Sequence, residues 1–194
     1  MPISIGASEN SFANPIGLLS DCHRRIERFL QALLTVATRV ACGSLDAEHR
    51  RVLETALKYF RESARKHTAD EEEDLFPKLR QLASLRISTV LADVDRLEAE
   101  HKTAEEWHRE VEDLCKLWLG QDFLPPEDAA HLRRLLTSLS ELYRTHIRME
   151  EEQVFPAAQA ELSASELRAI GCRMASRRGV LFIPERAVMS QLER

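Results

Sequence analysis

The chain has little of what β-folds, disulfide scaffolds and membrane spans require. It contains 6 glycines in 194 residues and 6% aromatic residues, which argues against an all-β fold. No apolar run reaches the roughly 18 residues of a transmembrane helix. The four cysteines form no C-x-x-C pair, and the N-terminus lacks the charged and apolar regions of a signal peptide. We therefore expect a cytoplasmic protein with reduced thiols.

The charge distribution excludes some classes of partner. The net charge is -5, and basic residues are spread among acidic ones. This pattern gives no reason to expect a nucleic acid or an anionic membrane as partner. Leu, Ala, Glu and Arg dominate the composition, and these residues favour helices.

Apolar residues recur with a period of 3.6 and predict four long helices. They run from Asn14 to Gly43, from about 46 to 79, from about 89 to 119 with a stop at Gly120, and from near 127 to 156. Pro77 is expected to end or kink the second helix, or to mark the start of a bent last segment. Short connections between long amphipathic helices predict an all-α fold, an antiparallel up-and-down four-helix bundle.

The ends of the chain are expected to differ from the bundle. We divide the sequence into an N-terminal arm (1–13), the bundle (14–160), and a C-terminal helix and tail (161–194). Ser163 and Glu166 form a capping box that begins a short fifth helix at about 165–177. The apolar segment 180–184 is expected to dock on the bundle, and the last ten residues to be mobile or helical at the surface.

One stretch occurs twice and organises the chain. Residues 67–77 and 146–156 share the pattern H-x3-E-E-E-x-[L/V]-F-P, offset by 79 positions. A histidine and a glutamate four residues apart lie on one face of a helix, so His67 and Glu71 form one pair, and His146 and Glu150 the other. His23 and His101 recur upstream, offset by 78 positions.

Imidazole and carboxylate side chains in this arrangement suit iron, manganese or zinc. The spacing alone is weak evidence, because His23–Glu27 and His101–Glu105 also show it and such pairs are common on helix surfaces. The conjunction of both copies with the two upstream histidines is what predicts a site for two metal ions. Four imidazoles, two bridging carboxylates and one oxo or hydroxo bridge would leave one position open on each metal. A bundle without metal, with its His-Glu pairs at the surface, remains the alternative.

At these residues the sequence resembles the hemerythrin-like, HHE cation-binding domains, over about residues 14–160. The resemblance rests on the two motif copies, on residues 21–26 (DCHRRI), and on Glu100-His101. It implies two iron ions. It also implies the ligands, with His23 and His67 on one iron, His101 and His146 on the other, and Glu71 and Glu150 bridging both.

One position departs from the oxygen-carrying hemerythrins, which have a fifth histidine where this chain has Glu105. Glu105 could be a ligand, the partner of a ligand, or merely polar. The pattern of four His and two Glu is more similar to the di-iron proteins that repair iron-sulfur centres after nitrosative stress. Those proteins usually carry a cysteine-bearing N-terminal segment that this sequence does not match.

These features predict a di-iron protein that binds dioxygen or nitric oxide, for sensing, storage or detoxification under oxidative or nitrosative stress. Two alternatives stay open: an enzyme acting on peroxide, nitric oxide or an organic substrate, and an iron donor for iron-sulfur repair. An apolar channel to the metals with Glu105 beside it would favour the enzyme. No catalytic residue is assigned, and a protein partner or homodimer is possible. His108 is expected near the core, and one of the glutamates after Glu71 or Glu150 to orient a ligand imidazole.

Overall fold

The computed structural model of the chain describes residues 10–183, and the regular elements in that range are helices. The all-α class is therefore confirmed. The α-helices and three π-helical turns (η) follow the chain in this order: α1 (Pro15–Arg39), α2 (Ala47–Tyr59), η1 (Phe60–Ala64), α3 (Arg65–Ala69), η2 (Asp70–Leu75), α4 (Phe76–Arg80), α5 (Leu85–Gln121), α6 (Pro126–Met149), η3 (Glu150–Val154), α7 (Phe155–Glu161) and α8 (Ala164–Arg177).

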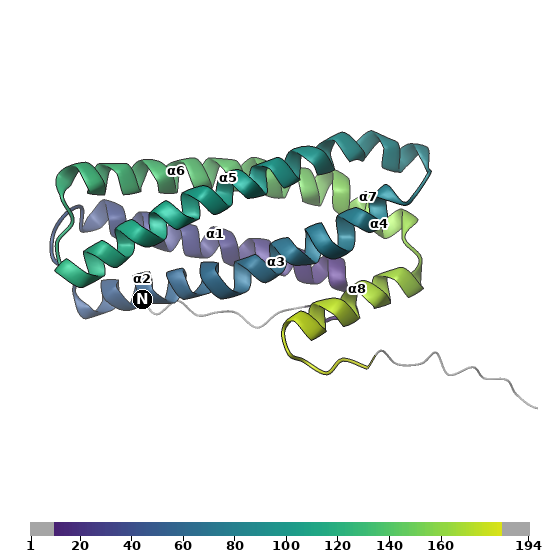
Figure 1. Cartoon of the computed structure of the whole chain (residues 1–194), viewed down its shortest axis with the longest axis horizontal. Coiled ribbons are helices and arrows are strands. Elements are labelled where there is room, and N and C mark those ends of the chain that lie inside the picture. Colours follow the sequence, from purple (N-terminus) through teal and green to yellow (C-terminus); the bar gives the residue numbers. More distant parts are fainter. Residues whose placement is uncertain (1–9, 184–194) are drawn as a thin grey trace, which may run out of the picture.

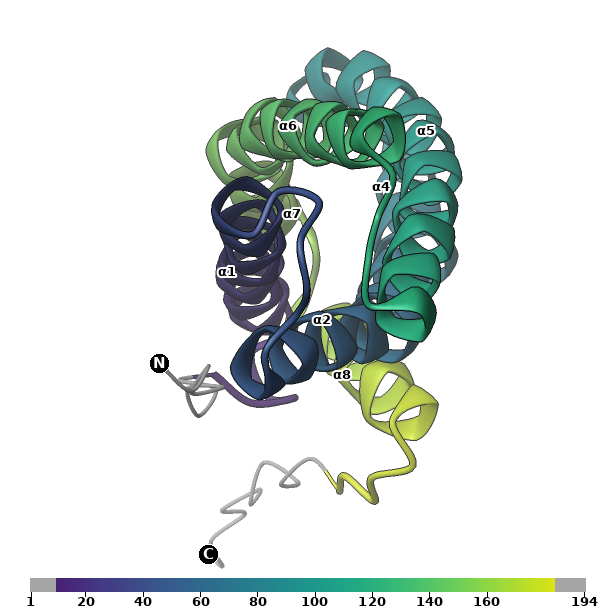
Figure 2. The same cartoon turned by 90° about the vertical axis from the view of Figure 1, so that its left-hand side faces the viewer.

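Four long helical runs make up the bundle. They are α1, the run from α2 to α4, α5, and the run from α6 to α7, and they extend along the same long axis (Figure 1). Seen from one end, they surround a common interior (Figure 2). Within residues 10–183, no helix is both long and apolar enough to cross a membrane.

Side-chain caps fix where the helices begin. The Asn14 side chain accepts a hydrogen bond from the backbone N–H of Gly17, and Asp46 and Ser84 cap α2 and α5 in the same way. The predicted capping box of Ser163 and Glu166 opens α8.

Two predicted helix ends were wrong. The first helix ends at Arg39, before Gly43, and Ala41 takes the left-handed conformation (φ 54°). Gly120 lies inside α5, which ends when Asp122 takes φ 56°. Aspartate tolerates this conformation, and its Oδ1 accepts hydrogen bonds from the Leu45 N–H (3.1 Å) and Arg50 (2.6 Å). These tertiary contacts decide the end of α5.

Pro77 does not end its helical run: it lies in the first turn of α4, the last short segment of the run, which continues to Arg80. A proline ring would meet the carbonyl four residues earlier in a regular α-helix. Here the π-helical turn η2 comes directly before it, and the Phe76 N–H bonds the Glu71 carbonyl five residues back. The second copy repeats this, because Phe155 N–H bonds the Glu150 carbonyl ahead of Pro156.

The apolar core consists of two clusters with polar residues between them. On α1, Leu19 belongs to one cluster and Ile26 to the other, with His23 between them; on α5, His101 lies between Leu97 and Ala104. The histidines are therefore held at a boundary between two packed apolar regions, near the middle of the bundle.

The C-terminal segment corrects one prediction. Helix α8 packs against η2 and α1, but the apolar tail beyond it does not dock on the bundle: Val180, Leu181 and Ile183 are exposed. After α8 the chain turns at Gly179 (φ 68°). In the tail, the ring of Phe182 packs against the ring of Phe12, with centroids 5.8 Å apart. Pro184, the last ten residues and residues 1–9 of the predicted arm lie outside the described residues. The division at 13 and 160 stays a prediction.

Candidate metal centre

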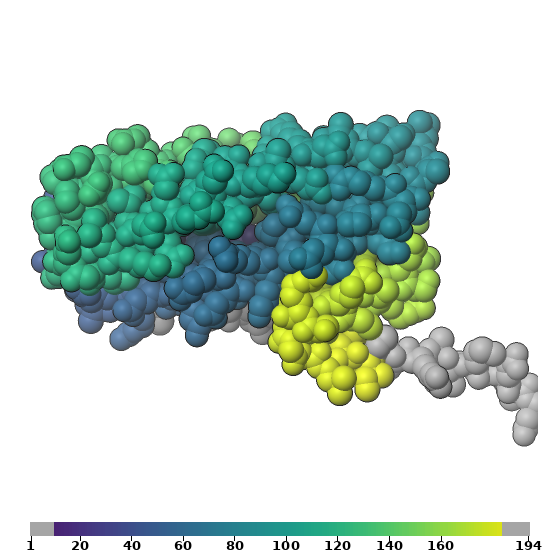
Figure 3. Space-filling model, viewed as in Figure 1, coloured from purple at the N-terminus to yellow at the C-terminus, as the bar shows by residue number. Residues whose placement is uncertain are grey.

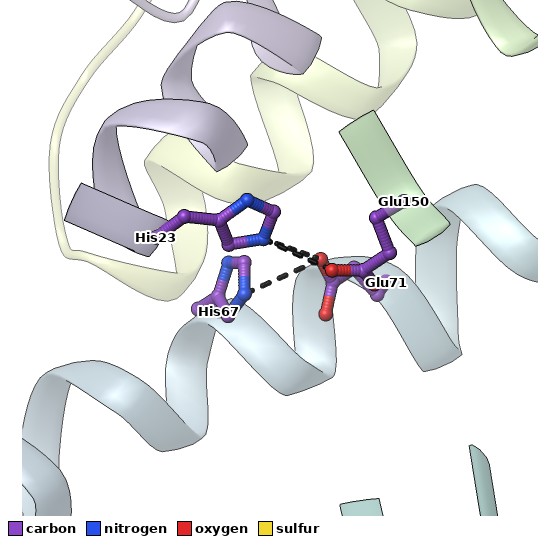
Figure 4. Close-up of side chains that lie close together, drawn as sticks. All are labelled: His23, His67, Glu71 and Glu150. Carbon is purple, nitrogen blue, oxygen red and sulfur yellow. Dashed lines mark ion pairs between the residues drawn. The ribbon is translucent and has the colours of Figure 1, made fainter. Parts of the chain in front are cut away.

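The six predicted ligand residues come together in the bundle interior, and all are buried. His23 from α1, His67 from α3, Glu71 from η2 and Glu150 from η3 form one group (Figure 4). His101 from α5 and His146 from α6 form a second group with the same Glu150. In each group the candidate ligand atoms lie within 4.8 Å of one another.

Each carboxylate faces imidazoles from both halves of the chain. Oε1 of Glu71 lies 3.3 Å from Nε2 of His67, and its Oε2 lies 3.5 Å from Nε2 of His101. Oε2 of Glu150 lies 3.0 Å from Nε2 of His23 and 3.5 Å from Nε2 of His146. A carboxylate between two sets of nitrogen donors is suited to join two metal ions.

The buried polar atoms of this cluster test whether a metal fits. Nε2 of His23 and both carboxylate oxygens of Glu71 and Glu150 make no hydrogen bond of acceptable geometry among residues 10–183, although imidazole nitrogens and carboxylate oxygens approach to 3.0–3.5 Å. Burying such groups without partners costs free energy, roughly 1–3 kcal/mol for a neutral group and more for a charged one. A cation at the centre of the cluster would satisfy them, so the donor set fits a metal ion.

The protonation states without metal show how strongly these groups interact. Burial and the neighbouring Glu150 raise the pKa of Glu71 to about 7. Burial lowers the pKa of His146, but Glu150, Glu100 and Glu71 outweigh it and raise the pKa to about 9. Burial and the nearby His23 lower the pKa of His67 well below its usual value. Protons shared between carboxylates and imidazoles thus balance the charge that a metal would otherwise balance.

Three of the four imidazoles are oriented by a carboxylate on their other nitrogen. Nδ1 of His23 lies 3.0 Å from Glu151, Nδ1 of His101 lies 2.9 Å from Glu72, and Nδ1 of His146 lies 3.1 Å from Glu100. The prediction that a glutamate after the bridging position orients an imidazole is confirmed in both copies. Such a partner fixes the ring and increases its basicity as a ligand. The role of Glu100 was missed, although its place directly before His101 was noted.

The phenylalanines of the repeated motif pack on histidines from the other half. The ring of Phe76 is stacked on His101 (centroids 6.3 Å apart), and that of Phe155 on His23 (5.4 Å). Glu72 and Phe76 of the first copy thus hold His101, and Glu151 and Phe155 of the second copy hold His23. Each half of the chain thus orients a histidine of the other half, in a pseudo-two-fold arrangement. The repeated motif extends beyond the His-Glu pair because it includes these orienting residues.

Glu105 and His108 do not join the cluster. Glu105 is exposed and lies 3.4 Å from Arg65. Nε2 of His108 lies 3.1 Å from the hydroxyl of Tyr143, as expected for a polar residue near the core. Cys22, next to His23, is buried and packs in the interior.

Two buried acids next to the candidate ligand Glu71 were missed. Asp70 and Asp74 lie in η2 beside Glu71, and α8 with its C-cap residue supplies their partners: Arg177 and the C-cap Arg178 bond Asp70, and Arg173 and Arg177 bond Asp74. The two acids are four residues apart, and so are Arg173 and Arg177, which places each pair on one face of its helix. This spacing was the sequence signal from which the pairing could have been predicted. This network ties the C-terminal helix to the turn that carries Glu71.

Comparison with known proteins agrees with this geometry. Over 168 residues the chain is 28% identical to an uncharacterized protein of Haemophilus influenzae, an overlap of 86% of this chain and 91% of the relative. Residues 14–158 match the hemerythrin HHE cation binding domain. The match spans most of the chain and includes all six candidate ligand residues, and the chain therefore belongs to the hemerythrin HHE cation-binding family.

Proposed function

We propose that this protein is a non-haem di-iron protein that binds dioxygen or nitric oxide. In this proposal, two irons are held by the following residues: His23, His67, Glu71, His101, His146 and Glu150. The observation that carries it is the position of Glu71, whose two oxygens approach imidazoles from opposite halves while lacking hydrogen-bond partners among the described residues.

The remaining parts of the chain have defined tasks in this proposal. Ferrous iron would supply the electrons and the open positions that a diatomic ligand needs. Glu72, Glu100 and Glu151 hold three imidazoles by their Nδ1 atoms and so keep Nε2 directed at the centre. The two apolar clusters exclude bulk water from either side. The four helical runs are proposed to alternate in direction, as an antiparallel up-and-down bundle.

The test is iron content measured on the full chain after anaerobic reconstitution. We expect two irons per chain, and the loss of at least one in Glu71→Ala or Glu150→Ala. Glu152→Ala is the matched control, because Glu152 belongs to the same glutamate triplet but is exposed. No stoichiometric iron in the unaltered chain, or unchanged iron in both ligand variants, would overturn the proposal.

Optical spectra of the reduced, iron-loaded protein then separate the roles. A stable spectral change on oxygen exposure that reverses when oxygen is removed supports ligand binding. Oxidation that runs on without a stable adduct supports turnover instead.

A second candidate, an enzyme acting on peroxide, nitric oxide or an organic substrate, is favoured by one feature. A pocket of about 320 Å³ opens beside His101 and is lined by apolar and charged residues, Glu105 among them. Steady consumption of peroxide or nitric oxide with a reductant would distinguish this function from binding.

A further inference from the structure

A pocket beside the candidate metal centre lies between two helical runs. One wall is formed by residues 57–73 and the other by α5, and the surface is visibly hollowed between these segments (Figure 3). His101 and Tyr143 both line the pocket. The Tyr143 ring lies 6.1 Å from the ring of His146. The pocket therefore extends to His101 itself and to a neighbour of His146, and these two histidines are the candidate ligands of the second metal.

The size of this pocket does not match a diatomic ligand. A cavity needs roughly 10–15 Å³ to hold a single water, and pockets that bind drug-sized ligands measure roughly 300–1,000 Å³. The pocket measures about 320 Å³. It has room for an organic molecule of one or two rings.

The charges around the pocket balance and do not favour an ion. Four basic and four acidic side chains line it: Arg61, Arg65, Lys102, Arg109, Glu72, Glu73, Glu105 and Glu112. Arg61 pairs with Glu112 across the two walls (3.1 Å), and Arg65 pairs with Glu105 (3.4 Å). Since the cations are matched by anions, the pocket has no excess charge with which to attract a charged ligand.

The buried part of the wall combines an apolar surface with one neutral polar pair. Phe60, Ala64 and Ala104 are among the apolar residues. The ring of His108 is stacked on Phe60 (centroids 4.3 Å apart), and its Nε2 lies 3.1 Å from the Tyr143 hydroxyl. Burial lowers the pKa of His108 to about 4, and burial raises the pKa of Tyr143, so both are neutral at pH 7.

This pair sets the hydrogen-bonding preference of the pocket. The Tyr143 hydroxyl and Nε2 of His108 share one hydrogen bond, and the imidazole tautomer decides which of the two donates. With either tautomer the phenol oxygen keeps a lone pair, which can accept a hydrogen bond from a ligand. A ligand with a neutral O–H donor and a flat apolar body would complement both the oxygen and the aromatic wall.

We propose that this pocket binds a neutral aromatic alcohol, of the phenol or naphthol class, with its hydroxyl on Tyr143 and its rings between Phe60 and Ala104. Its use as a substrate site rests on the proposed di-iron centre and on the second candidate function, an enzyme acting on an organic substrate. Binding itself depends only on the pocket, and the two can be tested apart.

The experiment is calorimetric titration of the full chain with 2-naphthol, without oxygen, in metal-free and iron-loaded forms. We expect saturable binding to both forms. 2-Naphthoate, of similar size but charged, and naphthalene, without the hydroxyl, should bind more weakly. Tyr143→Phe should weaken 2-naphthol binding roughly three- to tenfold and leave naphthalene unchanged, as for the loss of one net hydrogen bond.

The chain offers a matched control, because it has two tyrosines. Tyr59 bonds the Cys22 carbonyl and does not line the pocket, so Tyr59→Phe should bind 2-naphthol like the unaltered chain. Ala104→Phe should fill the pocket and abolish binding while the iron content stays unchanged.

The outcomes separate the two proposals. No saturable binding, equal binding of 2-naphthoate, or unchanged affinity in Tyr143→Phe would overturn the pocket assignment. Iron content measured on the same samples decides the metal centre separately. Bound naphthol without stoichiometric iron would therefore overturn the proposed function and leave the binding site standing.

Discussion

Nδ1 of His146 lies 3.1 Å from Oε2 of Glu100, whereas Nδ1 of His67, its counterpart in the first half, has no hydrogen-bond partner among residues 10–183. Glu100 directly precedes His101, and the residue that directly precedes His23 is Cys22. Cys22 therefore stands where the second half has Glu100. A thiol is a weak acceptor, so the pseudo-symmetry of the centre is broken at His67.

In the proposed di-iron centre, this asymmetry predicts unequal release of the two irons. The iron bound by His23 and His67 should leave first, because loss of such a partner typically lowers metal affinity roughly 10–100-fold. Release to a ferrous chelator should then show two phases of one iron each. Glu100→Gln should speed the slow phase about tenfold, while Glu110→Gln, at an exposed position of the same helix, should not. A single phase for both irons would contradict the prediction, and a very fast first phase would favour the iron-donor alternative.

Replacing a bridging candidate should affect the metal-free and loaded proteins in opposite directions. Glu71 is fully buried, and its oxygens have no hydrogen-bond partner among the described residues. Glu71→Met keeps the side-chain length, removes this cost, and should raise the unfolding free energy of the metal-free protein by about 1 kcal/mol. The stabilisation gained on adding iron should shrink. Urea unfolding with and without iron measures both quantities. A metal-free variant less stable than the unaltered chain would count against the prediction.

Apolar periodicity and the repeated motif were enough to predict most of the helices and the buried His/Glu cluster. Apolar spacing predicted the helices because each long helix buries one face. The offset between His67 and His146 predicted the cluster because two equivalent helices must present equivalent faces to one interior. The carboxylates that orient His101 and His23 could also be predicted, since Glu72 and Glu151 lie inside the repeated motif.

Features that depend on contacts between distant segments could not be predicted in the same way. The burial of Asp70 and Asp74 requires arginines about 100 positions later. The end of α5 at Asp122 depends on Leu45 and Arg50. The effect of Pro77 depends on a π-helical turn that propensities do not encode. Hydrophobicity alone suggested docking for residues 180–184, but Leu181 and Ile183 are exposed.

The arginines of α8 should be important for stability and metal retention. In Arg177→Ala/Arg178→Ala, the buried Asp70 loses both of its arginine partners, one from the last residue of α8 and one from its C-cap. An unpaired buried charge costs roughly 3–5 kcal/mol, so the unfolding free energy should fall by about that amount. Arg168→Ala, at an exposed position of α8, should change it by less than about 0.5 kcal/mol. Adding Asp70→Asn to the double variant should recover part of the loss. If it recovers none, the arginines act through other contacts.

Pro77 should hold Glu71 in place through the shape of the helix. Its ring requires the wide turn in which the Phe76 N–H bonds the Glu71 carbonyl, five residues back. Pro77→Ala restores an N–H and removes the ring, so the run can relax toward a regular α-helix. Loss of the extra residue in the turn would rotate Glu71 by about 100° relative to α4, away from its present direction. We expect iron content below two per chain, with helical content unchanged by circular dichroism. Pro126→Ala, at the first position of α6 with no π-helical turn before it, is the matched control and should keep two irons. If Pro77→Ala keeps both irons with unchanged release rates, the turn is held by packing of η2 against α8 and not by the proline.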